Sequence, residues 1–264
     1  MKRTSALALV LVLAVTALCV RLGFWQIGRW HEKQRLNAEM RATLETPVLD
    51  VSASPPGLDE VRGHRVAVEG RFDESRQILL GYRTHDGAPG VEVVTPLVLP
   101  GGRIAVLVDR GWLYAADAAT ARPQDAPEPG ARAVIGVPVA LRRGAVPGQP
   151  AAGAAMRVLT TDSLTLWSVR WLDADTLAPH FPYALAPWML RELPGPGVPG
   201  RPLRTTPRPL DEWTHVSYAV QWFLFGTILL GGSAALAWSR SRQASAGGRA
   251  PSVSDADPDL HRRG

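Results

Sequence analysis

Cysteine and lysine are nearly absent from this sequence of 264 residues. A single cysteine, Cys19, excludes an intrachain disulfide framework and a zinc site built from several cysteines. Only two of the 29 basic residues are lysines, and the arginines are scattered along the chain. The net charge of +5 therefore forms no basic stripe of the kind that phosphate binding needs. We expect no nucleic-acid partner.

The familiar catalytic motifs are also missing. We find no Gly-x-Ser-x-Gly, His-Glu-x-x-His or Cys-x-x-Cys, and no phosphate-binding glycine loop. The six histidines form no pair with metal-ligand spacing. An enzyme would require His64, His85 or His180 to lie beside a carboxylate or hydroxyl in a cleft. The sequence thus predicts that the protein is not an enzyme.

The N-terminal region, residues 1–28, is an apolar run that follows Lys2 and Arg3. From Ser5 to Gly28 it has 24 residues with one charge, Arg21, which is enough to cross about 30 Å of hydrocarbon. A cleavable signal peptide would share the basic start and the apolar core. No small-x-small cleavage site follows the core, so we predict an uncleaved transmembrane anchor.

A second membrane-length run occupies residues 215–238. Val216–Trp238 contains no ionised side chain, and Trp213 and Trp238 stand at the expected interfacial positions. Small residues, among them Gly226, Gly231 and Gly232, would let another helix approach closely. Basic residues flank both runs on their terminal sides. We therefore expect both termini on the cytoplasmic side and residues 29–214 outside.

The middle of the chain differs in composition from its ends. Charged, helix-favouring residues at 29–46 predict a helical juxtamembrane segment. Residues 47–193 favour a β-rich domain, with strands at 64–69, 77–80, 91–99, 103–109, 133–139 and 164–172, and a loop at 145–155. The proline-rich residues 194–214 predict an extended linker, and residues 239–264 a disordered cytoplasmic tail.

The start of the second run carries the most distinctive side chains. His215, Tyr218, Ala219, Trp222 and Gly226 fall on one helical face. A histidine with aromatic walls and small residues beneath could hold a flat macrocycle, since histidine is a common axial ligand of haem iron. The alternative is an interfacial aromatic belt that anchors the helix. Arg29, near Trp25, could pair with a haem propionate or with a lipid headgroup.

A second motif, Asp109-Arg110-Gly111-Trp112, ends an apolar strand. Its first two residues are an ion-pair candidate. Arg and Trp are favoured interface anchors, so Arg110, Gly111 and Trp112 could form a surface that binds a partner protein. The alternative is a buried arginine–carboxylate strut, with Trp112 capping the core.

Taken in order, these motifs resemble the Surfeit locus protein one family of cytochrome c oxidase biogenesis factors. The resemblance rests on five segments: Leu22-Gly-Phe-Trp-Gln26 with Arg29, Val66-Ala-Val-Glu-Gly-Arg-Phe72, Val94-Thr-Pro-Leu97, Val106-Leu-Val-Asp-Arg-Gly-Trp112 and His215-Val-Ser-Tyr-Ala-Val-Gln-Trp-Phe223. It implies two transmembrane helices that flank a β-rich, barrel-like extracytoplasmic domain.

The resemblance also implies a function in respiratory-chain assembly. It indicates a multi-pass protein of the bacterial plasma membrane that binds haem a and delivers it to cytochrome c oxidase subunit I, in company with other oxidase assembly factors and the lipid bilayer. His215 would be the ligand of the haem iron, with Tyr218 and Trp222 as pocket walls and Arg29 as a weaker candidate. The alternative is a scaffold without haem, which stabilises an oxidase subunit through the outer domain.

Overall fold

The computed structural model describes residues 3–144, 156–161 and 164–247. The chain divides into two compact units, which we describe separately. The helical unit comprises residues 1–35 and 210–264, and the β unit comprises residues 36–209. The loop expected at 145–155 and the tail after residue 247 lie outside the described residues.

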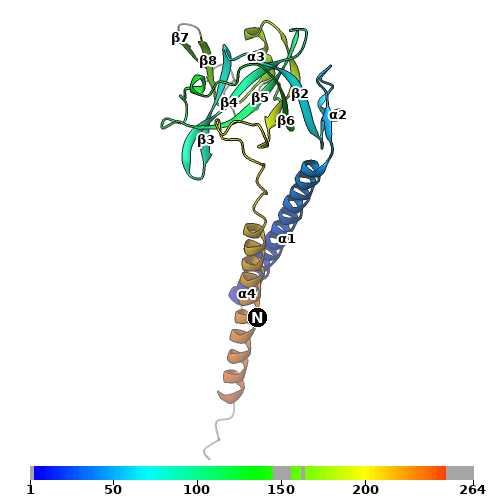
Figure 1. The fold of residues 1–264 in the computed structure, drawn as a ribbon. Coiled ribbons are helices and arrows are strands. Elements are labelled where there is room, and N and C mark those ends of the chain that lie inside the picture. The colour runs from blue at the N-terminus through cyan, green and yellow to red at the C-terminus, as the bar shows by residue number, and fades with distance from the viewer. Residues whose placement is uncertain (1–2, 145–155, 162–163, 248–264) are drawn as a thin grey trace, which may run out of the picture. The chain divides into compact units, whose positions relative to one another are not determined.

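The β unit is built on one sheet, which has nine strands in the described part of the chain (Figure 1). The strands are β1 (Val48–Asp50), β2 (Arg65–Phe72), β3 (Arg76–His85), β4 (Ala88–Val98), β5 (Ile104–Tyr114), β6 (Ala131–Ala140), β7 (Arg157–Thr161), β8 (Leu164–Val169) and β9 (Ala184–Glu192). Short helical turns connect them: α2 (Leu58–Val61), η1 (Pro123–Asp125), α3 (Ala174–Leu177) and η3 (Ala178–His180).

The sheet curls until it pairs with itself. Its strand order is β1-β2-β6-β9-β5-β4-β3-β8-β7, with an additional pairing between β2 and β4. At that pairing Arg71 lies opposite Val98, and Phe72 lies opposite Leu97. Strands β2, β6, β9, β5 and β4 therefore form a closed ring, and β3, β8 and β7 extend from it. This confirms the expectation of a barrel-like β domain between two helices.

Side-chain alternation along β5 separates two apolar cores. Val106 and Val108 belong to the cluster that includes Phe72 and Trp188, whereas Leu107 packs in a second cluster with Trp167. Successive residues of a strand point to opposite faces of the sheet. The same alternation continues to Asp109 and Arg110, where the candidate motif begins, and the register with β4 shifts just after them.

Strands β1, β7 and β9 were not expected from the sequence. Strand β9 contains Pro187, which normally argues against a strand with neighbours on both sides. Here the pairing of β5 with β9 passes from Ala105–Leu185 to Leu107–Met189. A step of two residues along β5 thus corresponds to a step of four along β9. Pro187 lies in this irregularity, where no ladder hydrogen bond requires its missing N–H.

The proline-rich segment is not a free linker over its whole length. Leu203 exchanges backbone hydrogen bonds with Trp112, at 2.9 Å and 2.8 Å, and forms an isolated bridge with it. The compact β unit extends to Pro209. Within the segment expected as an extended linker, residues 194–214, the backbone at Leu203 therefore pairs with the end of β5.

The helical unit consists of two long helices, α1 (Arg3–Glu45), which continues into the β unit, and α4 (Trp213–Gly247). The juxtamembrane residues 29–45 continue α1 without a break. Helix α4 runs nine residues past Trp238, so residues 239–247 are helical rather than disordered. This stretch contains no proline, and its arginines, glutamine and alanines favour a helix.

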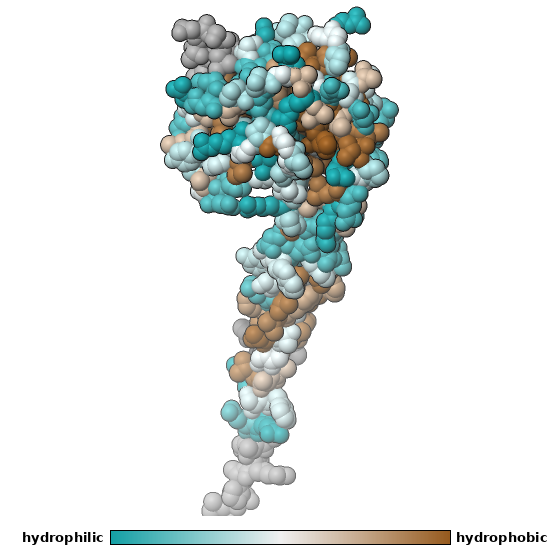
Figure 2. Space-filling view, viewed as in Figure 1, coloured by the Kyte–Doolittle hydropathy of each residue, from teal (hydrophilic) through white to brown (hydrophobic). Residues whose placement is uncertain are grey.

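Both helices have the length and apolar composition to cross a membrane, and one of them lies near the N-terminus. Most of their large apolar side chains are exposed, and Figure 2 shows brown, apolar surface along this unit. Leu7, for example, is 70% exposed and Ile228 is 67% exposed. Extended apolar surface of this kind is compatible with membrane insertion.

Candidate functional site

Helices α1 and α4 pack against each other in antiparallel directions. Gln26 contacts His215, and further along the pair Gly226 faces Cys19 and Thr16. From the first contact to the second, the residue numbers decrease along α1 and increase along α4, so the two helices are antiparallel. The N-terminus of α1 and the C-terminus of α4 are thus at the same end of the helix pair.

One row of buried or half-buried positions repeats every 3.5 residues on each helix. These buried or half-buried positions are Val12, Thr16, Cys19, Gly23, Gln26 and Trp30 on α1, and His215, Ala219, Trp222, Gly226, Leu229 and Ser233 on α4. Alternating steps of three and four residues are typical of left-handed coiled-coil packing. The candidate histidine therefore belongs to the seam between the helices.

Within this seam His215 forms a hydrogen bond to Gln26. The His215 Nδ1 atom lies 2.6 Å from the Gln26 Oε1 atom, and the two residues are 189 positions apart in sequence. An amide oxygen can only accept a hydrogen bond, so this contact is a hydrogen bond in the tautomer that carries its proton on Nδ1. The second ring nitrogen, Nε2, then carries the lone pair, which is the form in which imidazole binds a metal.

The other residues of the predicted face take two different roles. Ala219 and Gly226 are buried against α1, and a β carbon on Gly226 would lie 3.6 Å from that of Cys19. Tyr218 is 48% exposed, and Trp222 is half-buried and makes an edge contact with Phe225. The small residues therefore do not form a hollow beneath a macrocycle, because they admit the neighbouring helix. Tyr218 and Trp222 border His215 along the helix.

Arg29 forms an ion pair with Glu32, one turn further along α1, and both side chains are nearly half exposed. Trp25 is exposed as well. This surface position is compatible with either of the two roles that the sequence allows, a propionate partner or a headgroup anchor.

Two residues that the sequence analysis did not single out hold this region together. Gln26 is buried in the seam, although it is polar and lies within an apolar stretch. Asp211 accepts hydrogen bonds from Thr214 Oγ1 and, at 3.0 Å, from the backbone N–H of Trp213, and so caps the start of α4. The hydrogen bond from Thr214 is the main cause that lowers the pKa of Asp211. In the sequence, a polar glutamine within an apolar helical run was the signal that could have indicated a buried hydrogen bond at Gln26.

The second candidate motif ends β5. Asp109 and Arg110 are not paired with each other, because successive residues of a strand point to opposite faces. Asp109 pairs with Arg191, at 3.2 Å, and Arg110 pairs with Glu128, at 2.8 Å. The ion pair expected within the motif is therefore wrong, and each residue has a distant partner instead.

Arg110 is fully buried at the centre of a charged cluster. The cluster consists of Glu74, Arg110, Glu128, Arg132, Glu192 and Arg204. Arg110 also donates to the carbonyl of Ala126, at 2.6 Å, and lies over the ring of Phe72. Burial, followed by the charge of Arg204, lowers the pKa of Arg110 to about 10, so the guanidinium remains charged at neutral pH. Of the two alternatives for Arg110, this is the buried strut.

Gly111 is the point where the proline-rich segment crosses β5. Its φ is +109°, and a β carbon there would lie 2.3 Å from the carbonyl oxygen of Leu203. Arg204 follows at once and donates to Glu192, at 2.9 Å. The docked segment, which we define as residues 201–204, is thus held by backbone pairing and by buried charge.

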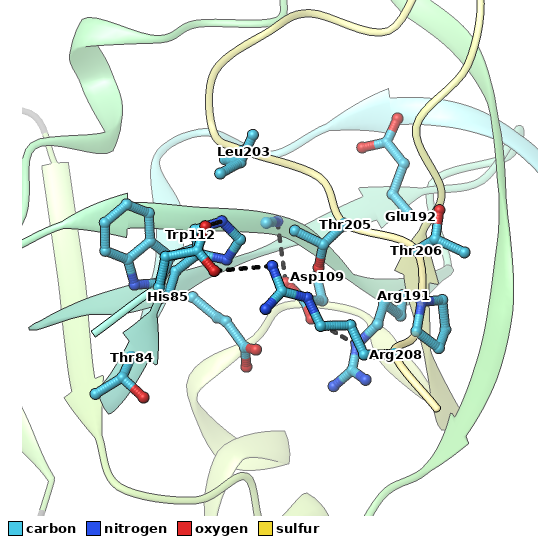
Figure 3. Close-up of a pocket in the computed structure, with 14 residues that line it drawn as sticks. Thr84, His85, Asp109, Trp112, Arg191, Glu192, Leu203, Thr205, Thr206 and Arg208 are labelled. Carbon is cyan, nitrogen blue, oxygen red and sulfur yellow. Dashed lines mark hydrogen bonds and ion pairs between the residues drawn. The ribbon is translucent and has the colours of Figure 1, made fainter. Parts of the chain in front are cut away.

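Beside this crossing lies a cavity of about 220 Å³ (Figure 3). Asp109 lines it, and accepts hydrogen bonds from the Nε of Arg191, at 3.2 Å, and from the N–H of Gly111, at 3.0 Å. Burial, together with the nearby charge of Glu92, raises the pKa of Asp109 to about 6, despite the opposing effect of Arg191. The carboxyl group of Asp109 is therefore close to titration at neutral pH.

His85 also lines this cavity. Its Nε2 atom lies 3.3 Å from the carboxylate of Asp86, and its ring contacts that of Trp112 at a tilt of 38°, with centroids 5.4 Å apart. Asp86 is the next residue in the chain and pairs with Arg208 as well, so the contact belongs to the ion pairing of this loop. Among the described residues, no group of three or more His, Cys, Asp or Glu could hold a metal ion.

Comparison with known proteins agrees with the resemblance in the motifs. The sequence model of the SURF1 family matches residues 13–227. An uncharacterized SURF1-like protein of Mycobacterium tuberculosis is 36% identical over 113 residues, which are 41% of this chain and 41% of that protein. A SURF1-like protein of Rickettsia felis is 33% identical over 103 residues, 38% of this chain and 44% of the relative.

A SURF1-like protein of Monosiga brevicollis is 32% identical over 117 residues, 40% of this chain and 45% of that protein. The matched regions thus span less than half the length of these relatives. The family match is broader and covers the chain's first helix from residue 13 onward and the His215 segment of its last helix. The chain belongs to the SURF1 family.

Proposed function

We propose that this protein is an integral membrane assembly factor for cytochrome c oxidase, a haem–copper terminal oxidase, and that it binds haem a and delivers it to the catalytic subunit. The observation that carries the proposal is the state of His215. Its Nδ1 atom contacts Oε1 of Gln26, and in the neutral ring that donates from Nδ1 the other nitrogen, Nε2, has a lone pair for a metal. In this role haem is cargo rather than a resident cofactor, and the protein is not an enzyme.

The donor set of the helical unit suits haem and not a bare metal ion. A single imidazole, that of His215, could bind haem iron, because the porphyrin itself supplies four nitrogen ligands. Tyr218, which is exposed, and Trp222, which is half-buried, would flank the macrocycle beside the part of α4 that Ala219 and Gly226 fill against α1. Arg29 would be the candidate for a propionate group, in exchange for its pair with Glu32.

The antiparallel helix pair supports a particular topology. Both helices would cross the bacterial plasma membrane, with both termini in the cytoplasm and the β unit outside. Lys2 and Arg3 precede the first apolar run, and Arg240 and Arg242 follow the second, which agrees with basic residues on the cytoplasmic side. Reporter fusions at residues 120 and 250 test this; a cytoplasmic signal at residue 120 would overturn it.

The haem hypothesis is tested with the full chain purified in detergent from cells that make haem a. We expect a haem absorption spectrum that His215→Ala removes, whereas His31→Ala, an exposed histidine of the same helical unit, retains it. If His215→Ala left the spectrum unchanged, the assignment of the ligand would be wrong. If the wild type carried no haem and bound none on addition, haem delivery would be excluded.

The second candidate function is a scaffold without haem that stabilises an oxidase subunit. Arg110 and Gly111 are engaged by the chain's own residues, so the scaffold hypothesis depends on Trp112. Trp112, Leu203 and the exposed Tyr114 line a cavity of about 630 Å³ that a partner could enter. This hypothesis expects co-purification of oxidase subunits that survives His215→Ala and is lost on Tyr114→Ala or Trp112→Ala.

A further inference from the structure

We propose that Gln26 is a positioning residue for His215, which fixes the proton on Nδ1 and thereby presents Nε2 to the haem iron. The inference rests on the proposed function and adds to it a second residue, from the opposite helix. It assigns to α1 a part in ligand binding, besides membrane anchoring. The two helices then form a single binding device rather than an anchor and a site.

The contact is specific and enclosed. Gln26 is 8% exposed, and its Oε1 atom lies 2.6 Å from Nδ1 of His215. A hydrogen bond within an apolar seam is shielded from competition by water, so it is stronger there than at a wet surface. Burial of an amide with no partner would be unfavourable, so the pairing also accounts for a glutamine at this position.

The chemistry of the pair determines which nitrogen is free. A neutral imidazole has one N–H donor and one acceptor nitrogen, and its hydrogen-bond partner selects between the two forms. With the amide oxygen on Nδ1, the donor is Nδ1 and the acceptor is Nε2. Histidines that bind metals typically donate their other N–H to an oxygen, which fixes the ring and raises the basicity of the ligand.

Contacts on either side of the pair hold the two helices in register. On the side nearer the β unit in sequence, Lys33 Nζ donates to the carbonyl of Asp211, at 2.9 Å. On the other side the ring of Phe223 covers Gly23, where a β carbon would lie 2.7 Å from the ring. The Gly23 contact leaves no room for a side chain, so it sets the register close to Gln26, and the exposed Lys33 contact adds to it. His215 is thereby kept opposite Gln26.

The first experiment measures the tautomer without haem. The full chain with ¹⁵N-labelled histidine is studied by NMR in detergent, and the His215 signals are identified by their loss in His215→Ala. We expect the Nδ1–H form in the wild type and in Gln221→Leu, which changes an exposed glutamine of α4. In Gln26→Leu that form should lose its preference. An unchanged tautomer in Gln26→Leu would overturn the proposal.

The second experiment measures the ligand. Added haem a or protohaem should bind Gln26→Leu about 10- to 100-fold more weakly than the wild type, as is typical when the partner of a metal-binding histidine is lost. The iron–histidine stretching band in resonance Raman spectra should also shift. Gln26→Glu keeps an acceptor and is expected to retain haem, with the band shifted the opposite way by the stronger acceptor. If Gln26→Leu does not fold, the band shift in Gln26→Glu tests the proposal in its place.

These outcomes separate the inference from the proposed function. If the wild type binds haem, His215→Ala abolishes binding and Gln26→Leu changes neither affinity nor the Raman band, only the role of Gln26 is wrong. If His215→Ala binds haem as the wild type does, the ligand assignment fails, and with it the inference. If the wild type binds no haem, haem delivery fails, and so does the part of Gln26 in it.

Discussion

The carbonyl oxygen of Leu203 lies 2.3 Å from the point at which a β carbon on Gly111 would stand. Only a residue without a side chain lets the segment before α4 cross the end of β5 so closely. Trp112, the next residue, pairs with Leu203 through two backbone hydrogen bonds. The chain that leads to the second apolar helix is therefore bound to the β unit by a contact that depends on glycine.

Replacement of that glycine should weaken the β unit. Gly111→Ala introduces both a clash with Leu203 and an unfavourable φ of +109°. We expect a loss of about 1–3 kcal/mol in the free energy of unfolding, measured by denaturant unfolding of the detergent-solubilised chain. Gly130→Ala is the matched control, because its φ is +95° with no atom within 4 Å of the added carbon. Equal losses in the two variants would mean that the crossing contributes nothing.

The buried charge of Arg204 should contribute strongly to the free energy of unfolding of the β unit. It is buried with Glu128 and Glu192, and its removal leaves these carboxylates with two arginines in place of three. Breaking a buried ion pair typically costs about 3–5 kcal/mol, because an uncompensated charge remains. Arg204→Leu should therefore lower the free energy of unfolding by an amount of this order.

Arg208→Leu is the control for that variant. Arg208 pairs with Asp86 at the surface, where both side chains are well exposed, and such pairs contribute about 0–1 kcal/mol. If the two substitutions had the same small effect in thermal or denaturant unfolding, the docked segment would not be held by the charged cluster.

The barrel and the two helices could largely be predicted, because both depend on local patterns. Alternation and turn residues place strands β2 to β6, and apolar length places the helices. Strand β9 was not predicted, and the sheet accommodates its Pro187 at an irregular register with β5.

The partners of the candidate residues could not be predicted from spacing. Gln26 meets His215 across 189 positions, and Arg110 meets Glu128 across 18. These pairings are decided by which faces of the helices and strands pack together, and a single sequence gives no measure of that. His215 was identifiable because its aromatic neighbours share its own helix, whereas the residue that orients it lies on another.

The stability of the β unit should rise as the pH is lowered from 7 toward 4. The pKa of Asp109 is raised from 3.8 to about 6, so the folded state binds a proton that the unfolded state has not yet bound between these values. The charged carboxylate therefore destabilises the folded state above pH 6. Protonation relieves this by at most about 3 kcal/mol as the pH falls through the folded pKa toward 4.

Asp109→Asn tests the assignment. The variant should lose the rise in stability between pH 6 and 4, whereas Asp59→Asn, an exposed aspartate, should retain it. Unfolding is followed at constant salt, with the circular dichroism of the sheet as the signal. A rise that persists unchanged in Asp109→Asn would assign it to another group.

The antiparallel helix pair predicts a disulfide that the natural chain lacks. A β carbon on Gly226 would lie 3.6 Å from the β carbon of Cys19, within the range of about 3.5–4.5 Å that disulfides require. Gly226→Cys should therefore crosslink to Cys19 under mild oxidation, in membranes and in detergent, and the monomer should migrate faster on a gel without reductant. Gly231→Cys, which has no atom within 4 Å of the added carbon, should not crosslink. Equal crosslinking of the two variants would contradict the packing that brings Gln26 to His215, because that contact and this one belong to the same seam.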